Sequence, residues 1–505
     1  MIIRSREFLD ASGVPPLEML SSVIAEHMNG LPRMEKLKAY YMARNDIRNR
    51  QRASGMPNNR ISHAFARYIT TVTAGYLVGK PVSYSAATES ATLDAILDNF
   101  KRNSIAAVDS ENARNASIYG KGVEFAYVNA AAVPKVSAIS PMNAFVVYDD
   151  THETKPMFGV YYTNKTKANG VADGYRIWLM TDREILEYES GTPAAGNFTE
   201  TKRTRHFFGG VPLVEYWNDE NECGDFEWVI SQIDAYDTLA SDRVNDKQQF
   251  VDRLLVLYGC TLDKDERGRE PWQQLREDKA LCLPDTDTKA EYLGDMMDET
   301  SNEILRNNIA EDIHKLSMVP DLSDKNFAAN ASGVAMKYKL FGLEQLTKIK
   351  EQWFREGLKT RLQLFINFFG VTGKQALDVA DVKIEFTRAM PANLLELAQT
   401  VQAANGAMST ETKVKTLHDG EEWSQEDVDK EVKAINATSA QMFDQKMELY
   451  QNKAYRLADI RSDVTGEETE EAQAAINKIK AEGGSNTENS AMDRLLAGIN
   501  TGSEE

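Results

Sequence analysis

The alternation of apolar and polar residues between positions 228 and 370 predicts two long helices that flank a small unit, followed by a third and longer helix. Over 228–255, apolar residues recur at steps of three, four and seven, and no Pro or Gly interrupts them. The same kind of pattern returns over 296–317 and ends before Pro320. Short apolar runs and a period of two within 256–295 predict a compact α/β unit between these two helices.

A polar stretch over 318–331 predicts a loop, because Pro, Ser, Asp and Asn are frequent in it. Ser332 then stands at an N-cap position, and an apolar stripe continues from there to about position 370. Gly342 and Gly357 are the points at which a bend in this third helix would cost least. Periodicity alone is at least as typical of a long core helix in an ordinary α-rich domain.

The N-terminal part of the chain predicts helices followed by strands. Residues 1–57 form amphipathic, mixed-charge patterns that indicate helices, and a second helical segment opens at Asn58. From 123 to 217, apolar runs separated by Gly, Asn and Asp turns predict an antiparallel β-rich subdomain. A basic cluster precedes Asn58, and we interpret it as a solvated face: Arg44, Arg48, Arg50 and Arg52.

The C-terminal part predicts one more strand and several helices. The strand lies at 382–386, and the helix that begins at Pro391 ends near Gly406, since Pro favours helix starts and Gly favours helix ends. Ser424 is a capping residue for a further helix. The segment 461–505 is rich in Glu, Ala, Gly, Ser and Asn, which indicates an acidic, partly disordered tail. The predicted fold class is therefore mainly α with a β-rich subdomain, in the α+β class.

Composition places the chain among soluble globular proteins. It has 505 residues, of which 42% are hydrophobic and 27% charged, and this length predicts more than one domain. No apolar run reaches the roughly 18 residues that a membrane span requires, and we expect no signal peptide. Three isolated cysteines indicate a reducing cytosol. The net charge of −19 argues against tight binding of nucleic acid, which depends on Lys and Arg neutralising phosphates.

The search for catalytic or metal-binding patterns predicts none, and no cofactor. Six histidines have no ligand spacing, and G-x-S-x-G, HExxH and dinucleotide-binding patterns are absent from the sequence. The string over 75–81 is no phosphate-binding loop, since its glycines are one residue too close and Pro81 replaces the Ser or Thr that would bind magnesium. Glu299 and Glu303 share a helical face and could bind a metal, but such pairs more often line a solvated or channel-facing surface.

Several strings together resemble one family, the portal proteins of tailed bacteriophages. Each string is weakly specific, but their order and spacing cover about 39–427. The strings are NNRI (58–61), GYLVGKP (75–81), SPMNAFVVYD (140–149), GVPLVEY (210–216), IDAYD (233–237), SGVAMKYKL (332–340) and FTRAMPAN (386–393).

The resemblance implies a ring of subunits, usually twelve, around a channel for double-stranded DNA. It divides the chain into an N-terminal outer-wing segment and a series of named regions. These are the outer wing 1–57, wing with β-rich subdomain 58–227, stem helices 228–255 and 296–317, clip 256–295, channel loop 318–331, long wing helix and strand 332–385, crown helices 386–460 and tail 461–505.

Three sets of site residues follow from this resemblance. The channel-loop residues are Asp321, Ser323, Asp324, Lys325, Asn326 and Asn330. The candidates for lining the channel are Asp298, Glu299, Glu303, Asp312 and Lys337. The clip residues expected to dock the packaging motor or adaptors are Asp263, Arg267, Trp272, Arg276, Glu277 and Asp285.

The implied function is a conduit for DNA packaging and ejection at one capsid vertex, without catalysis. The implied partners are further copies of the chain, double-stranded DNA bound without sequence specificity, the terminase large subunit, scaffold and major capsid protein, and head-completion or adaptor proteins, with no membrane. We expect synthesis in the bacterial host cytoplasm and a place in the virion. Two alternatives stay open: a metal-dependent DNA-processing enzyme, and an α-rich adaptor without a channel.

Overall fold

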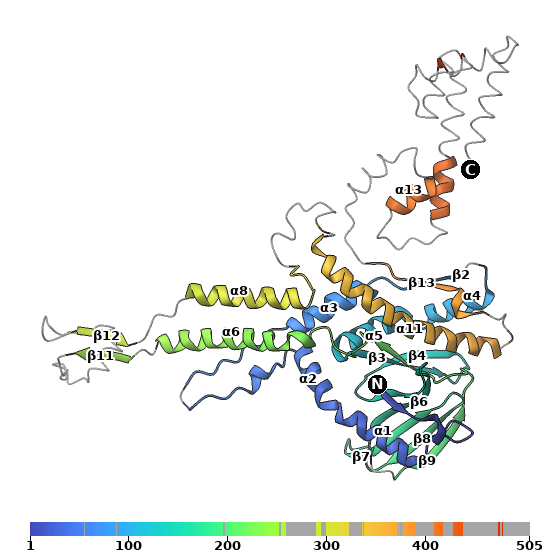
Figure 1. Cartoon of the computed structure of the whole chain (residues 1–505), viewed down its shortest axis with the longest axis horizontal. Helices are drawn as coiled ribbons and strands as arrows, with labels where there is room; N and C mark the ends of the chain where they lie inside the picture. Colours follow the sequence, from blue (N-terminus) through green and yellow to red (C-terminus); the bar gives the residue numbers. More distant parts are fainter. Residues whose placement is uncertain are drawn as a thin grey trace. The chain divides into compact units, whose positions relative to one another are not determined.

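The computed structural model describes residues 1–54, 56–86, 88–194, 197–251, 254–258, 289–293, 299–322, 336, 338–371, 373, 377–388, 409–417, 428–437, 473–474 and 477. The chain divides into two compact units, Met1–Ala389 and Met390–Glu505. The first contains the mixed helices and sheets described next (Figure 1). In the second, the described part includes α13 (Thr410–Leu417) and a helical stretch over 428–437.

A six-stranded sheet forms most of the predicted β-rich subdomain. Its order is β1-β5-β6-β7-β8-β9, and every neighbouring pair is antiparallel except β1 with β5. One face packs on helix α1 (Leu17–Asn29) through a buried cluster that includes Ile24, Phe158 and Leu179. The strands are β1 (Ile2–Arg4), β5 (Ala144–Asp149), β6 (Pro156–Thr166), β7 (Ala172–Met180), β8 (Glu184–Ser190) and β9 (Thr199–Arg205).

The prediction of antiparallel strands over 123–217 is confirmed, and two strands of this sheet were missed. β9 carries a fully exposed, charged sequence, so it has no apolar alternation to reveal it. Ile2–Arg4 is a strand that pairs parallel to β5, so the helical interpretation of 1–57 is wrong there. Three residues are too few for any periodicity, and only the partner strand determines their conformation.

Three smaller sheets complete the described β structure. β10 (Leu213–Trp217), β3 (Lys121–Val128) and β4 (Pro134–Ile139) form an antiparallel sheet in the order β10-β3-β4. β13 (Val382–Glu385) pairs with β2 (Ser83–Ala86), which confirms the strand predicted near 382–386. β11 (Leu254–Tyr258) pairs with β12 (Lys289–Leu293), as the short apolar runs within 256–295 predicted.

The main core lies beneath α11 (Phe341–Val371), the longest described helix. Phe354, Leu358, Leu362 and Phe365 are buried along one stripe, where α11 packs against β10 and α4. The helix continues through Gly357, one of the two glycines at which a bend was predicted to cost least, whereas Gly342 is its second residue because α11 begins at Phe341. At Gly357 a Cβ would overlap the ring of Tyr216, so this glycine permits close packing of the helix on β10.

Four further helices surround this core. α3 (Phe65–Val78), α4 (Ala91–Arg102) and α5 (Ile105–Tyr119) contribute buried residues to it, and α2 (Leu31–Tyr41) packs on α3 and α5. Short 3-10 turns occupy Arg6–Phe8, Asp46–Asn49, Glu227–Val229 and Val379–Asp381.

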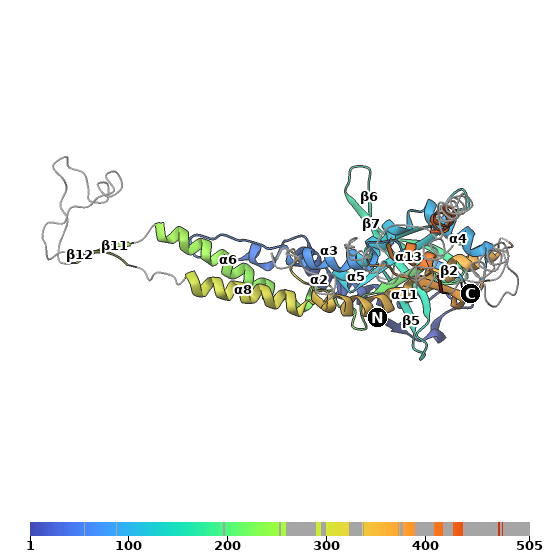
Figure 2. The same ribbon diagram turned by 90° about the horizontal axis from the view of Figure 1, so that it is seen from above.

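Helices α6 (Ile230–Val251) and α8 (Glu299–Leu316) are the two helices predicted around the small unit. They lie side by side, which both Figure 1 and Figure 2 show, and β11 and β12 lie between them in the chain. Their order and approximate lengths confirm the prediction. The middle of the predicted α/β unit, residues 259–288, lies outside the described residues.

Candidate functional site

The α6–α8 pair is joined by charged side chains as well as apolar ones. Arg243 on α6 donates to the carboxylate of Glu303 on α8 at 2.6 Å, and Arg306 donates to the same carboxylate at 2.5 Å. Ile233 and Ile313 are fully buried. Glu303 was a candidate for lining a channel or binding a metal. Because its carboxylate lies between two guanidinium groups, it is a helix-pairing residue in this subunit.

An extended segment before α3 follows α6 through regularly spaced hydrogen bonds. The backbone N–H groups of Asn59, Ile61 and His63 donate to side chains of α6, at 2.7, 3.0 and 2.9 Å respectively. The acceptors are Asn245, Ser241 and Asp237. The donors are two residues apart, as residues on one side of an extended chain are. The acceptors are four residues apart, as residues on one face of a helix are, so the extended segment can run along that face.

This segment corrects the predicted start of the helix at Asn58. Helix α3 begins at Phe65, because the preceding amides are bonded to α6 and cannot enter a helical pattern. Asp237 has no exposed side-chain surface and also accepts from the side chain of Asn45 at 2.5 Å. Asp237 is thus a buried acceptor on α6.

Further aspartates of α6 hold the N-terminal region. The hydroxyl of Tyr40 donates to Asp234 at 2.5 Å, and burial raises the pKa of Asp234. Asp242 pairs with both Arg50 and Arg52. The interpretation of the basic cluster as a solvated face is therefore wrong for Arg50 and Arg52, since opposing acids on α6 were not visible from local sequence. It agrees with the exposure of the other two members, Arg44 and Arg48.

The chain that leaves α8 is held against α3 over the first residues of the predicted loop. The hydroxyl of Tyr68 donates to the carbonyl of Pro320 at 2.8 Å and accepts from the N–H of Leu322 at 2.9 Å. A ring nitrogen of His314 lies 2.9 Å from the carbonyl of Val319. Burial raises the pKa of Tyr68, which keeps its hydroxyl protonated as a donor.

Only some of the predicted site residues belong to the described part of the chain. Asp312 and Asp321 are exposed, and Glu299 is the first residue of α8. Outside the described residues lie the loop residues Ser323, Asp324, Lys325, Asn326 and Asn330, the channel candidates Asp298 and Lys337, and the clip residues Asp263, Arg267, Trp272, Arg276, Glu277 and Asp285.

Two buried ion-pair clusters link α11 to other elements of the first unit. The sequence analysis predicted neither of them. Arg361 is fully buried and donates to Glu124 at 2.7 Å and to Asp109 at 2.5 Å. Lys350 pairs with Asp225 at 2.5 Å. Burial favours the neutral form of Asp225, but Lys350 together with hydrogen bonds from Ser117 and Thr73 outweighs it, so the pKa of this carboxyl is lowered. The available signal was a charged residue at position 361 inside an apolar stripe of α11.

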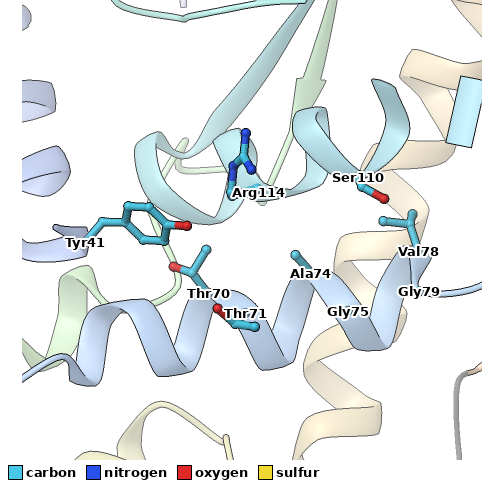
Figure 3. Close-up of a pocket in the computed structure, with 9 residues that line it drawn as sticks. All are labelled: Tyr41, Thr70, Thr71, Ala74, Gly75, Val78, Gly79, Ser110 and Arg114. Atoms are coloured by element: carbon cyan, nitrogen blue, oxygen red, sulfur yellow. The ribbon is translucent and has the colours of Figure 1, made fainter. Parts of the chain in front are cut away.

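A hollow of about 280 Å³ lies between α2, α3 and α5. Figure 3 shows Thr71, Ala74 and Gly75 on α3, with Ser110 and Arg114 of α5 across from them. The remaining lining residues are Tyr41, Thr70, Val78 and Gly79.

Within the described ranges, no group of three or more His, Cys, Asp or Glu residues has the arrangement of a metal site. The helices of that same part of the chain include none with the length and apolarity that a membrane crossing requires. The side chains of α6, α8 and α3 pack these helices together and hold neighbouring backbone segments in place through hydrogen bonds.

Comparison with known proteins identifies the class. The family described as "Phage portal protein, SPP1 Gp6-like" matches residues 20–442, and the chain belongs to this family. It is 25% identical over 431 residues to the portal protein of Bacillus phage SPP1, covering 79% of this chain and 83% of the relative. It is 23% identical over 432 residues to the portal protein of Clostridium phage phiCD119, covering 78% and 91%.

Solved structures with limited similarity come from gene transfer agent (GTA) particles. One is titled as the neck of an empty GTA particle computed with C6 symmetry; it has a TM-score of 0.40 and 13% identity, and the match covers 70% of this chain and 90% of that one. Another is titled as the neck of a native GTA particle computed with C12 symmetry, with a TM-score of 0.39, 12% identity and coverage of 76% and 92%.

Proposed function

We propose that this phage portal protein assembles into a ring, of twelve subunits as the family resemblance implies, at one vertex of the capsid. The ring encloses the channel through which double-stranded DNA enters during packaging and leaves during ejection. The observation that carries this proposal is the family match over residues 20–442. The antiparallel α6–α8 pair, with a small unit between the two helices in sequence, supports it as a stem that lines the channel.

Charge supports transport of DNA without tight binding. The chain has a net charge of −19, so a ring of copies is strongly acidic. Acidic groups on a channel wall repel phosphates, and few counterions are then released to hold the DNA in place. Asp312 and Asp321 are exposed, and we propose that they face the channel together with Glu299. Glu303 contributes less, because Arg243 and Arg306 neutralise it.

The finer assignments are part of the same proposal. The segment 58–227 is the wing, 256–295 the clip and 386–460 the crown, and 318–331 is the channel loop. Tyr68 and His314 hold the chain at 319–322, which supports a loop that starts from a fixed point. The clip binds the terminase large subunit, which supplies ATP hydrolysis, and later head-completion proteins. Scaffold and major capsid protein are further partners of the ring, and the ring has its place in the virion.

The first experiment is a mass measurement of the purified protein by light scattering, at low and high salt, with negative-stain images of the same sample. Rings with a central hole are the expected result. A monomer at micromolar concentration under all salt conditions would contradict the proposal, and particles without a hole would favour an adaptor.

A second experiment addresses the loop. Replacing 321–330 with a Gly-Ser linker of equal length is expected to leave rings intact and to reduce DNA packaging strongly. The matched control is the same kind of linker at 167–171, a surface turn between β6 and β7. Normal packaging by the 321–330 variant would remove the loop from the mechanism.

A further inference from the structure

Helix α8 presents an exposed stripe on a face that α6 does not cover. Leu305, Asp312 and Leu316 follow one another at steps of seven and four, so they share one face of the helix. Leu305 is 49% and Leu316 53% exposed, and Asp312 is exposed between them. Among the described residues, the carboxylate of Asp312 has no ion-pair partner. Two large apolar side chains beside an unpaired acid indicate a surface that another surface covers.

The hollow between α2, α3 and α5 has complementary properties. Its wall includes the apolar side chains of Ala74 and Val78, and a Cβ placed on Gly75 would meet nothing within 4 Å, so the space above α3 is open. Two arginines stand at its rim: Arg114, in a half-exposed ion pair with Glu111 at 3.3 Å, and Arg67, which is exposed one turn before Thr71 on α3. Within the described part of the chain, Arg67 has no ion pair.

The size of the hollow favours a side chain over a free small molecule. Its volume of about 280 Å³ lies below the range of roughly 300–1,000 Å³ typical of small-molecule pockets. It accommodates one or two aliphatic side chains. The hydroxyl of Thr70 in its wall is buried and has no hydrogen-bond partner in the described structure.

We propose that the α8 stripe of one subunit docks into this hollow on a neighbouring copy of the chain. Leu316 enters the hollow, and Asp312, one turn earlier on the same stripe, pairs with Arg114 at the rim. The acidic, apolar stripe and the basic, partly apolar hollow match in charge and in chemistry. The inference rests on the proposed ring and specifies one of its subunit contacts.

Two different surfaces of one chain that fit each other produce a head-to-tail interface, and such an interface closes into a ring when the rotation is suitable. Within one subunit, α8 meets α3 through contacts of His314 with Phe65 and Tyr68. The residues that line the hollow come from the α2, α3 and α5 regions and include none of the described α8, so the subunit's own α8 does not fill it.

The test is charge reversal with rescue, using the full-length chain. Asp312→Arg and Arg114→Asp are each expected to lower the fraction of protein in rings at least tenfold at micromolar concentration, and the double variant is expected to restore it. Glu311→Arg is the matched control, because Glu311 is also exposed on α8 but lies off the stripe. It should assemble like the unaltered chain. Circular dichroism melting establishes that each variant is folded.

A cysteine pair provides an independent readout. Leu316→Cys combined with Thr71→Cys is expected to form disulfide-linked oligomers on a non-reducing gel, whereas each single variant, with the three native cysteines, should not. Rings of the unaltered chain with neither rescue nor cross-linking would overturn this contact and leave the proposed function standing. A monomeric unaltered chain would overturn both.

Discussion

The backbone N–H of His63 donates to the carboxylate of Asp237 at 2.9 Å, and this carboxylate has no exposed side-chain surface. The ring of His63 and the side-chain amide of Asn45 bond to the same residue. One aspartate on α6 thereby fixes three groups from the segment that precedes α3. Helix α6 and the N-terminal region are joined by buried hydrogen bonds, which depend on side-chain placement more than apolar contacts do.

Replacing Asp237 tests this joint. Asp237→Ala leaves buried donors without an acceptor, so we expect a loss of about 3 kcal/mol in the free energy of unfolding. Urea unfolding at fixed protein concentration measures it. Asp246→Ala, on the same helix without a recorded partner among the described residues, is the control and should change stability by less than about 0.5 kcal/mol. Equal effects of the two substitutions would contradict this role of Asp237.

Because Arg361 forms buried ion pairs, we expect its replacement to lower the free energy of unfolding strongly as well. Arg361→Met leaves Glu124 and Asp109 buried without their counter-charge, and such unpaired charges cost about 3–5 kcal/mol. Arg203→Met removes an arginine that is 44% exposed and also pairs with two acids, and we expect less than about 1 kcal/mol there. Denaturant unfolding of the two variants provides the comparison, and similar losses would argue against the core role of Arg361.

Two glycines of α11 make opposite predictions. Gly357→Ala introduces a Cβ into the ring of Tyr216, and overpacking of this kind costs about 1–3 kcal/mol. A Cβ on Gly370 meets nothing within 4 Å, so Gly370→Ala should be neutral or stabilise by up to about 1 kcal/mol through helix propensity. Thermal unfolding distinguishes them. A harmless Gly357→Ala would show that α11 and β10 are packed less closely than described.

His27 predicts a dependence of stability on pH. Its ring lies against Phe145 and bonds to Tyr162 and to the carbonyl of Pro141, and burial lowers its pKa to about 4. The unfolded chain, with a pKa of about 6.5, takes up the proton first as pH falls. The contribution of His27 is therefore complete above pH 6.5 and is lost toward pH 4.

At pH 4, the contribution of His27 to the free energy of unfolding is expected to be about 3 kcal/mol smaller than it is above pH 6.5. Unfolding measured from pH 7 to 4 should show a smaller decrease for His27→Gln than for the unaltered chain. His152→Gln, at an exposed histidine, should leave the pH profile unchanged. If His27→Gln also kept the full decrease, the acid sensitivity would arise from other groups.

Tyr68 predicts a local effect. Tyr68→Phe removes the hydroxyl that accepts from the N–H of Leu322 and donates to Pro320, so the amide of Leu322 should exchange with solvent at least tenfold faster. Global stability should fall by only about 1–2 kcal/mol. Hydrogen exchange with mass spectrometry measures the first effect. Tyr338→Phe, at a tyrosine that is 79% exposed, is the control and should leave the exchange of Leu322 unchanged.

Local patterns predicted the elements whose burial follows a regular period. The long helices α6 and α8 and the interior strands β5 to β8 each carry an apolar face that is visible in a short window. The family resemblance extended this to the class of protein. Patterns failed at Ile2–Arg4 and at β9, where a short or fully charged strand has no apolar face and depends on its neighbour.

The sequence by itself determined the order of elements, the two helices on either side of the small α/β unit, and membership of the portal family. These features depend on periodicity and on ordered motifs. Only the tertiary structure decided which charges are paired. The pairs Asp237 with His63, Asp242 with Arg50 and Arg52, and Glu124 with Arg361 join residues far apart in the chain. No local period marks such pairs, since their energy depends on distance and burial, which folding alone sets.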